Sequence, residues 1–385
     1  MKNGSIIMSK RQQFKLDLVV KVSTGVLDRE TACLALGVSE RTLRRYLKAY
    51  REIGISFVVH GNSGRAPSNK TPDSIKDTVM NLYRSKYFDF NMAHGLEKIN
   101  EELDLDIKRE VFRRWCQEDG CVTRKKKRRG KIRVYRPRQR QAGMLIQMDG
   151  SYHKWFGNKM SCLIIAVDDA TGEIVSGGFY SAEKSEYCLE VLKELVGKRG
   201  AFNLLYVDKA GVFGGVKRSG FSQVERALSE VGTKVLYANS PQAKGRVERI
   251  FRTLQDRLIP ELRLAKIKSQ KKANDFFKKK FIPDHYNQKF VHSPEIEIPA
   301  YRKLSKMVDL DSIFCVKEYR KVAKDHTISL FGEKYLIDTE ALGHSIAGQT
   351  VSINLGNYKP KEVNYGNYSL PLVPIKKYKS GQIAA

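Results

Sequence analysis

Cysteine is sparse in this chain and forms no recognisable metal or redox motif. Six cysteines are spread over 385 residues, and no Cys-x-x-Cys pair occurs. Cys116 and Cys121 lie five positions apart, but no second pair of cysteines or histidines nearby completes a zinc site. We therefore expect reduced cysteines in a cytosolic protein. The six are Cys33, Cys116, Cys121, Cys162, Cys188 and Cys315.

Long hydrophobic runs are also missing. No apolar run reaches the roughly 18 residues that a membrane-spanning helix needs, and the lysine-containing start lacks the apolar segment of a signal peptide. We expect a cytoplasmic, nucleoid-associated protein with no membrane partner. Hydrophobic residues still make up 41% of the chain, which suits globular domains, and the length allows two or three of them.

Acidic residues are also few relative to basic ones. The chain has 42 acidic against 70 basic residues, a formal net charge of +28. Residues 1–140 carry 32 basic and 16 acidic residues, residues 141–258 carry 16 and 13, and residues 259–385 carry 22 and 13. Basic flanks of this kind attract a polyanion, and nucleic acid is the commonest one. An acidic membrane surface is the alternative, but no basic helix with a bulky apolar face supports it.

Residues 28–50 have the pattern of a helix-turn-helix. A short helix predicted over 28–36 is followed by Gly37, which tolerates the positive φ of a tight turn. Ser39 then caps a second helix, with Leu43 and Leu47 on its apolar face. The opposite face carries Arg41, Arg44, Arg45 and Lys48. Such a face suits phosphates and base edges in the major groove, although a plain helical hairpin with solvated arginines is the alternative.

A second helical unit is predicted over residues 73–122, after a linker over 59–72 that is rich in Gly, Ser, Asn and Pro. In its last helix Phe112 and Trp115 form an apolar side, and the opposite side is basic. We expect a second helix-turn-helix-like unit. Its residues predicted to contact DNA are Arg109, Arg113 and Arg114.

Residues 123–141 form a basic linker. Positions 124–140 hold 11 basic residues among 17 and no acid. Such a run repels itself and stays extended until a polyanion is present, so we expect it to follow DNA rather than to be only a solvated tail. The residues predicted to contact DNA in this linker are Lys126, Arg128 and Arg129.

From residue 142 to residue 305 short apolar strands alternate with amphipathic helices. We predict strands over 144–150, over both arms of a hairpin at 161–180, and over 202–208 and 233–240. Helices are predicted over 185–200, 221–232 and 242–258. This order indicates an α/β domain with a mixed sheet flanked by helices. The ranges 306–355 and 356–385 indicate a small all-β, barrel-like domain and a basic tail.

Three acids fall at related places in that α/β domain. Asp149 ends the first predicted strand, Asp208 ends the fourth, and Glu248 lies on the long helix that follows. Carboxylates at strand ends converge on one edge of a sheet, and hard oxygen ligands suit Mg²⁺ or Mn²⁺. Two such ions about 4 Å apart stabilise both oxygens of an in-line phosphoryl displacement. Any one of these acids alone would be a solvated turn residue or a helix ion pair, so the prediction depends on the set.

Other residues compete for a role in such a site. Asp168 and Asp169 precede an Ala-Thr-Gly turn, where an aspartate commonly bonds its own backbone, and we favour that interpretation. Trp155 follows the first strand. It is equally compatible with stacking on a displaced base and with packing inside a loop.

Three segments resemble the catalytic core of bacterial insertion-sequence DDE transposases and retroviral integrases: QMDGS (147–151), YVDKAGVF (206–213) and SPQAKGRVERIFRTLQDRL (240–258). The last is the most specific, because in that family Val-Glu-Arg after a Pro-Gln pair marks the helix with the third acid, here Glu248. The 58 residues between Asp149 and Asp208 and the 39 between Asp208 and Glu248 are close to the family's intervals. The likeness covers about residues 140–300.

The resemblance implies a multi-domain protein with an all-α helix-turn-helix region (1–58) and an RNase H-like, integrase-type catalytic core. It implies that Asp149, Asp208 and Glu248 hold two Mg²⁺ or Mn²⁺ ions. The implied activity is hydrolytic cutting of transposon-end DNA followed by 3′-hydroxyl strand transfer into target DNA. The implied partners are double-stranded DNA and further copies of the chain, as a homo-oligomer. An RNase H-fold nuclease without joining activity and a domesticated DNA-binding regulator are the alternatives.

Basic residues around the second and third acids extend the predicted site. Many family members have Asn-Gly or Arg-Gly after the second acid, whereas this chain has Lys209 there. We expect Lys209 to contact the scissile strand. On the helix of the third acid, charge and resemblance both favour contacts to transposon-end DNA, with a solvated face as the alternative. The residues predicted for those contacts are Lys244, Arg246 and Arg249.

Overall fold

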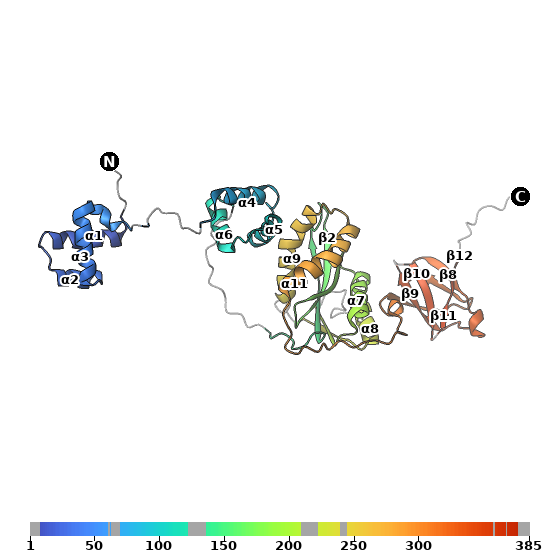
Figure 1. Cartoon of the computed structure of the whole chain (residues 1–385). Helices are drawn as coiled ribbons and strands as arrows, with labels where there is room; N and C mark the ends of the chain where they lie inside the picture. The colour runs from blue at the N-terminus through green and yellow to red at the C-terminus, as the bar shows by residue number, and fades with distance from the viewer. Residues whose placement is uncertain are drawn as a thin grey trace. The chain divides into compact units, whose positions relative to one another are not determined.

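The computed structural model describes residues 8–60, 62, 70–121, 136–208, 222–238, 245–356, 359–366 and 368–375. The chain divides into two compact units, Met1–Thr78 and Val79–Ala385, which are described separately. Figure 1 shows the elements in chain order. Among the described residues, no helix is both long and apolar enough to cross a membrane.

The first unit is helical, as predicted. It contains α1 (Lys10–Ser23), α2 (Arg29–Leu36), α3 (Glu40–Ile53) and a 3-10 turn, η1 (Gly54–Val58). The Asp28 side chain caps α2, and Gly37 ends it with a φ of 63°, the left-handed conformation that glycine adopts without strain. Leu43 and Leu47 of α3 pack with Val19 in a small core. The helix-turn-helix expectation for this fold is therefore confirmed.

Three further helices follow: α4 (Asp73–Ser85), α5 (Met92–Leu103) and α6 (Arg109–Glu118). Asn91 caps α5, and its side chain accepts from the His94 backbone. The Tyr83 and Phe112 rings meet edge to face, with centroids 5.2 Å apart. Trp115 is also buried on α6, as its apolar spacing predicts.

A five-stranded mixed sheet forms the α/β domain. Its strands are β1 (Leu145–His153), β2 (Ser161–Asp168), β3 (Ile174–Tyr180), β4 (Leu204–Val207) and β5 (Lys234–Tyr237), in the order β3-β2-β1-β4-β5. β1, β2 and β3 pair antiparallel, whereas β4 pairs parallel with both β1 and β5. This is the predicted RNase H-like mixed sheet.

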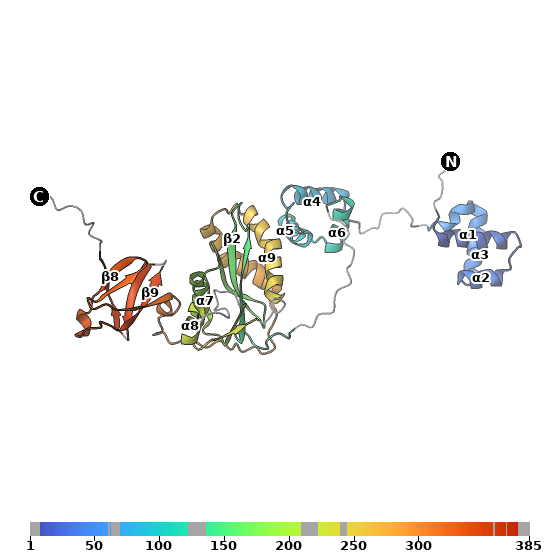
Figure 2. The same ribbon diagram turned by 180° about the vertical axis from the view of Figure 1, so that it is seen from behind.

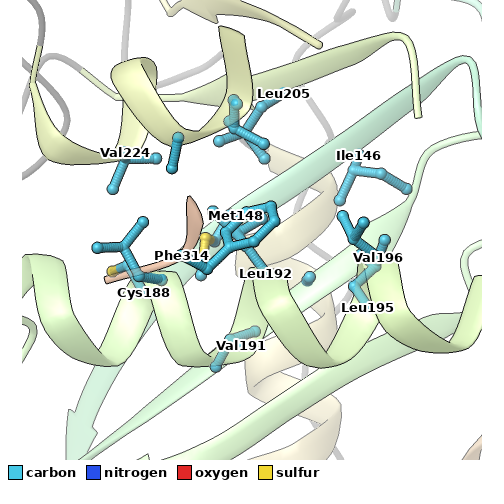
Figure 3. Packing of buried hydrophobic residues seen from close by; sticks show 14 of the residues in the cluster. Ile146, Met148, Cys188, Val191, Leu192, Leu195, Val196, Leu205, Val224 and Phe314 are labelled. Carbon is cyan, nitrogen blue, oxygen red and sulfur yellow. The ribbon is translucent and has the colours of Figure 1, made fainter. Parts of the chain in front are cut away.

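Helices cover both faces of the sheet (Figures 1 and 2). One face packs against α7 (Ser185–Arg199) and α8 (Gln223–Glu230). Figure 3 shows Ile146 and Met148 of β1 among side chains such as Leu192 of α7. The other face packs against α9 (Gly245–Leu264), α10 (Gln270–Phe276), the π-helix η3 (Phe277–Tyr286) and α11 (Asn287–Phe290). Because both faces are covered, β2 is buried along its whole length.

Two predicted boundaries in this domain are wrong. β1 does not end at Asp149 but continues to His153, because it pairs with β2 as far as Ser161. Gly150 permits this close packing, since a Cβ there would lie 3.0 Å from the Glu183 carboxyl carbon. α9 continues past residue 258 to Leu264, because Leu262 is buried on the same apolar stripe as Leu258.

The C-terminal part is all-β, as predicted. After α12 (Leu310–Ile313) come β6 (Val316–Lys321), β7 (Thr327–Leu330), β8 (Glu333–Ile337), a 3-10 turn η4 (Glu340–Leu342), β9 (Thr350–Gly356), β10 (Lys359–Tyr365), β11 (Tyr368–Leu370) and β12 (Leu372–Ile375). They form two sheets, ordered β11-β10-β9-β6 and β12-β8-β7. The strands continue past residue 356, where we expected only a basic tail, and Val363 and Leu370 are buried in this core. The strands beyond residue 356 carry too few apolar residues for an alternating pattern to be recognised in the sequence.

Candidate active site

Asp149 and Asp208 come from neighbouring parallel strands. β1 and β4 pair with Leu145 opposite Leu204 and Gln147 opposite Tyr206. The recorded pairing stops there, and Asp208 directly follows the last residue of β4. Continued by two residues, the same register would place Asp149 opposite Asp208, on strands about 4.8 Å apart. Asp149 projects from the face of β1 that also carries Gln147, because side chains alternate along a strand. Asp149 and Asp208 are both half-buried.

Glu248 lies on the helix that covers this face. α9 runs along β1 in the same direction: Arg246 and Gln147 both donate to the Asp169 carboxylate, and Gln255 Nε2 lies 3.4 Å from Ser151 Oγ. Asp149 lies between the two contact points on β1, and Glu248 lies between them on α9. Val247 and Phe251 are buried against the sheet. Glu248 is exposed beside them, in the first turn of the helix.

Two buried cysteines, Cys162 and Cys188, lie on the opposite face of the sheet, in the core that α7 covers. Burial, and then the charges of Glu183 and Asp149, raise the pKa of Cys162 to about 12. Burial, and then the charges of Glu183, Cys162 and Asp208, raise the pKa of Cys188 well above its ordinary value. Neither cysteine is a thiolate at neutral pH, so neither supplies a soft metal ligand beside the acids.

Asp168 and Asp169 are both buried but make different contacts. Asp168 accepts hydrogen bonds from the backbone of Ala170 at 2.9 Å and of Gly143 at 2.7 Å, so it holds the hairpin turn. The Asp169 carboxylate bonds to other segments instead. It accepts from Arg136 at 2.7 Å, from the Gln139 backbone at 2.9 Å, from Gln147 at 2.5 Å and from Arg246. The turn interpretation therefore describes Asp168 and misses Asp169.

Positive charge gathers beside Asp169. A cleft of about 180 Å³ is lined by Arg138, Arg246, Arg249 and His292, together with the rings of Tyr286 and Phe290. Arg246 also donates to the Arg136 backbone carbonyl. The contact of Arg246 and Arg249 with DNA stays a prediction.

Trp155 is a core residue. It is fully buried, with its ring centroid 5.9 Å from that of Phe179, and its Nε1 donates to the Ser151 carbonyl at 3.0 Å. Of the two interpretations left open, packing is the one that this geometry supports.

The predicted DNA-contacting residues of the helical regions lie on exposed surface. Arg41, Arg44, Arg45 and Lys48 line one shallow depression on α3, where Arg44 pairs with Glu40 at 2.7 Å. On α6, Arg113 pairs with Glu110, while Arg109 and Arg114 are exposed. Outside the described residues lie Lys126, Arg128, Arg129, Lys209 and Lys244.

A buried cluster of charges anchors the other end of α9. His94 of α5 donates to Glu261 of α9 at 2.9 Å, and Lys98 lies 3.0 Å from the same oxygen. Burial opposes the Glu261 charge, but the hydrogen bonds from His94 and Lys98 outweigh it and lower the pKa to about 2. Nearby, Arg257 of α9 forms a bidentate pair with Glu97 of α5.

In the part of the chain that the structure describes, His94, Glu261 and His285 are the one group with metal-ligand spacing. Asp149, Asp208 and Glu248, the three acids predicted to hold metal, do not lie together at that spacing. Cations already occupy the surroundings of the His94 group, because Lys98 contacts Glu261 and Arg257 Nη1 lies 3.4 Å from His285 Nε2. Burial, and then the charge of Lys289, lower the pKa of His285 to about 4. We interpret the cluster as a polar contact between α5, α9 and η3. No sequence motif marks it, because His94 and Glu261 are 167 residues apart in the chain.

Comparisons with known proteins match the N-terminal helical region to a family model and the chain to two transposases. The family model described as "Winged helix-turn helix" matches residues 15–77. "Putative transposase y4bF" of Sinorhizobium fredii is 32% identical over 378 residues, which cover 96% of this chain and 82% of that protein. "Transposase for insertion sequence IS1202" of Streptococcus pneumoniae is 31% identical over 300 residues, which cover 67% of this chain and 64% of that protein.

Two solved structures are more distant. The HTLV-2 integrase catalytic core domain in complex with magnesium matches 35% of this chain and 83% of its own length, at 16% identity and a TM-score of 0.29. The simian T-cell lymphotropic virus intasome in complex with PP2A regulatory subunit B56 gamma matches 77% of this chain and 96% of its own length, at 13% identity and a TM-score of 0.33. Similarity at this level is too low to support a functional conclusion, which depends on the sequence relatives instead.

Proposed function

The chain belongs to the transposase family of these relatives, and we propose that it is a metal-dependent polynucleotidyl transferase. In this proposal it binds the ends of its transposon, cuts DNA there by hydrolysis, and joins the freed 3′-hydroxyl to target DNA. The observation that supports it most is the β1–β4 register, which, continued by two residues, would place Asp149 opposite Asp208 on a sheet that α9 covers.

The chemistry of the acids fits a divalent cation. Asp149, Asp208 and Glu248 offer hard carboxylate oxygens, the ligands that Mg²⁺ and Mn²⁺ prefer. We propose that Asp149, Asp208 and Glu248 together would hold two such ions. When bound, such a pair supplies Lewis-acid stabilisation to the entering and leaving oxygens of an in-line displacement.

The remaining roles belong to the chain itself. Asp149 lies on β1 and Asp208 directly follows β4, in a sheet that helices cover on both faces, so we expect little reorganisation when substrate binds. We propose that α3 enters the major groove of the transposon end with Arg41, Arg44, Arg45 and Lys48. The exposed side of α9 would meet the phosphates next to Glu248 through Arg249.

Both proposed steps are direct displacements at phosphorus. In the first, a water oxygen bonds to the phosphorus and loses a proton, the bond from phosphorus to the 3′-oxygen breaks, and the released 3′-oxygen takes up a proton. In the second, the 3′-hydroxyl oxygen bonds to a target phosphorus and loses its proton. It displaces the target strand's own 3′-oxygen, which takes up a proton. No serine or tyrosine nucleophile is required. Because a transposon has two ends, we propose that at least two copies of the chain assemble on DNA.

Asp208→Asn tests the site. With duplexes that carry the inverted repeat flanking the gene, we expect cleavage and joining each to fall by at least about 100-fold, because a metal-holding carboxylate supplies several kcal/mol. Asp256→Asn is the matched control, since Asp256 is an exposed acid on α9. Wild-type rates for Asp208→Asn, or an equal loss for Asp256→Asn, would contradict the proposed site.

The joining step distinguishes a transposase from a nuclease of the same fold, because only the transposase joins DNA ends. A duplex with a pre-formed 3′-hydroxyl end needs no cleavage, so a transposase converts it to joined product with a plasmid target. Cleavage of intact ends with no joined product from the pre-cut duplex would favour the nuclease. Calorimetric titration with Mn²⁺ addresses the regulator alternative, because equal heats for wild type and Asp208→Asn would argue against metal at these acids.

A further inference from the structure

Asp169 joins three segments of the chain around the candidate active site. Its side chain is fully buried, with 0% exposure, and it follows directly after β2. It accepts hydrogen bonds from Gln147 of β1 at 2.5 Å, from Arg246 of α9, and from Arg136 at 2.7 Å. The Gln139 backbone donates to its second oxygen at 2.9 Å. Arg136 and Gln139 belong to the end of the basic linker.

Two of these partners lie close in sequence to the proposed metal-holding acids. Gln147 precedes Asp149 by two residues and projects from the same face of β1. Arg246 precedes Glu248 by two residues and lies in the first turn of α9. One buried carboxylate therefore connects the strand of the first acid to the helix of the third. Charge-assisted hydrogen bonds of this kind are among the strongest polar contacts in proteins.

The hairpin turn does not need Asp169. The neighbouring Asp168 accepts from the backbone of Ala170 and Gly143 and from the Tyr301 hydroxyl at 3.0 Å. Its contacts hold the turn and the end of the sheet. The two adjacent buried aspartates thus have different roles, one within the hairpin and one between β1, α9 and the linker end.

We propose that Asp169 is a positioning residue for the reaction. It fixes the start of α9, and with it Glu248, against Asp149 on β1, and it holds the end of the basic linker at the same point. This rests on the proposed role of Glu248 in metal binding. Because Asp169 acts through Arg246 and Gln147, it touches neither metal nor DNA itself.

Asp169→Asn tests the proposal, because it keeps the shape of the side chain and removes the charge that Arg246 and Arg136 share. Residues that orient metal ligands cost about 10–100-fold in metal affinity or activity when changed. We expect the Mn²⁺ concentration for half-maximal strand transfer to rise by about that factor. Calorimetric Mn²⁺ affinity, measured without DNA, is expected to fall in parallel.

Asp168→Asn is the matched control, as a buried aspartate next in sequence. We expect it to lower the melting temperature and, when assayed below that temperature, to keep the wild-type Mn²⁺ dependence. Gln147→Met is a second variant. It removes the hydrogen bond between β1 and Asp169 with little change in side-chain volume. If Asp169→Asn does not fold, Gln147→Met tests the proposal instead. We expect it to raise the Mn²⁺ concentration for half-maximal strand transfer as well.

A wild-type Mn²⁺ dependence in the folded Asp169 or Gln147 variant would overturn the proposal, and so would an equal shift in Asp168→Asn. These failures differ from a failure of the proposed function. If wild type neither joins DNA nor binds Mn²⁺, the proposed function is wrong. If wild type is active, Asp208→Asn is inactive and Asp169→Asn behaves as wild type, only the positioning role is wrong.

Discussion

Glu261 lies near the C-terminal end of α9 in a buried cluster of charges, and its replacement by glutamine has a calculable cost. Glutamine at this position keeps an oxygen that accepts from His94, but it lacks the charge that pairs with Lys98. It therefore mimics the protonated glutamate. The pKa of Glu261 is about 2 against an ordinary 4.5. That difference corresponds to roughly 3 kcal/mol, so we expect Glu261→Gln to lower the free energy of unfolding by about this amount at pH 7.

The pH dependence of stability gives a second, independent signature. A carboxylate with a lowered folded-state pKa contributes stability above its unfolded pKa, and this contribution is lost as pH falls through the folded value. For Glu261 the window runs from 4.5 down to about 2. Burial also opposes the charge of Glu97, but hydrogen bonds from Arg257 and Lys289 outweigh it and lower that pKa to about 2 as well. The loss of unfolding free energy with falling pH should therefore be smaller in Glu261→Gln than in wild type, but still present.

The two tryptophans allow the assay to separate the parts of the protein. Trp115 is buried on α6 and Trp155 is buried beside the sheet, so Trp155→Phe and Trp115→Phe backgrounds report on one part each. Urea unfolding followed by fluorescence gives the free energies. The control is Asp275→Asn, which removes an exposed pair with Lys279 and should cost no more than about 0.5 kcal/mol. A Glu261→Gln protein that is as stable as this control, and that loses stability with falling pH as wild type does, would show that the Glu261 charge does not stabilise the fold.

Three further outcomes are expected. The pKa of His285 is lowered to about 4, and burial also lowers the pKa of the neighbouring His94. The unfolded chain therefore takes up a proton first, and stability falls as pH drops from 6.5 to about 4. His285→Phe should reduce this dependence in urea unfolding, and an unchanged dependence would count against it. Arg45→Ala should weaken binding of a transposon-end duplex and reduce the salt slope of log affinity by about 1 in gel-shift titrations, whereas an unchanged slope would argue against a phosphate contact. In native protein a thiol reagent should label the exposed Cys121 and spare the buried Cys188, as read by mass spectrometry, and rapid Cys188 labelling would contradict its burial.

The fold is predictable where local chemistry and tertiary packing agree. Gly37 between two amphipathic segments indicates the helix-turn-helix, and the apolar run of β2 indicates a sheet covered on both faces. The end of β1 is not predictable, because Gly150 and Ser151 weaken the strand pattern and only pairing with β2 extends the strand. In the C-terminal sheets the strands beyond Gly356 carry single buried residues such as Val363, too few for a period of two to stand out.

The candidate site shows the same limit. Strand ends and resemblance select Asp149, Asp208 and Glu248, and their metal-binding role stays a prediction. The local sequence around Asp169 fits a turn and so predicts the wrong role for it. Its actual partners, Arg136 and Arg246, are 33 and 77 residues away in the chain. Contacts of that range depend on how helices pack on the sheet, which no local pattern reports.

Anomalous diffraction from crystals soaked in Mn²⁺ tests whether these carboxylates hold metal. We expect manganese peaks in contact with the carboxylates of Asp149 and Asp208, and their loss in Asp208→Asn crystals. The absence of a peak there, at a Mn²⁺ concentration that supports strand transfer, would contradict the proposed metal site. A peak only at the His94–Glu261–His285 cluster would contradict it equally.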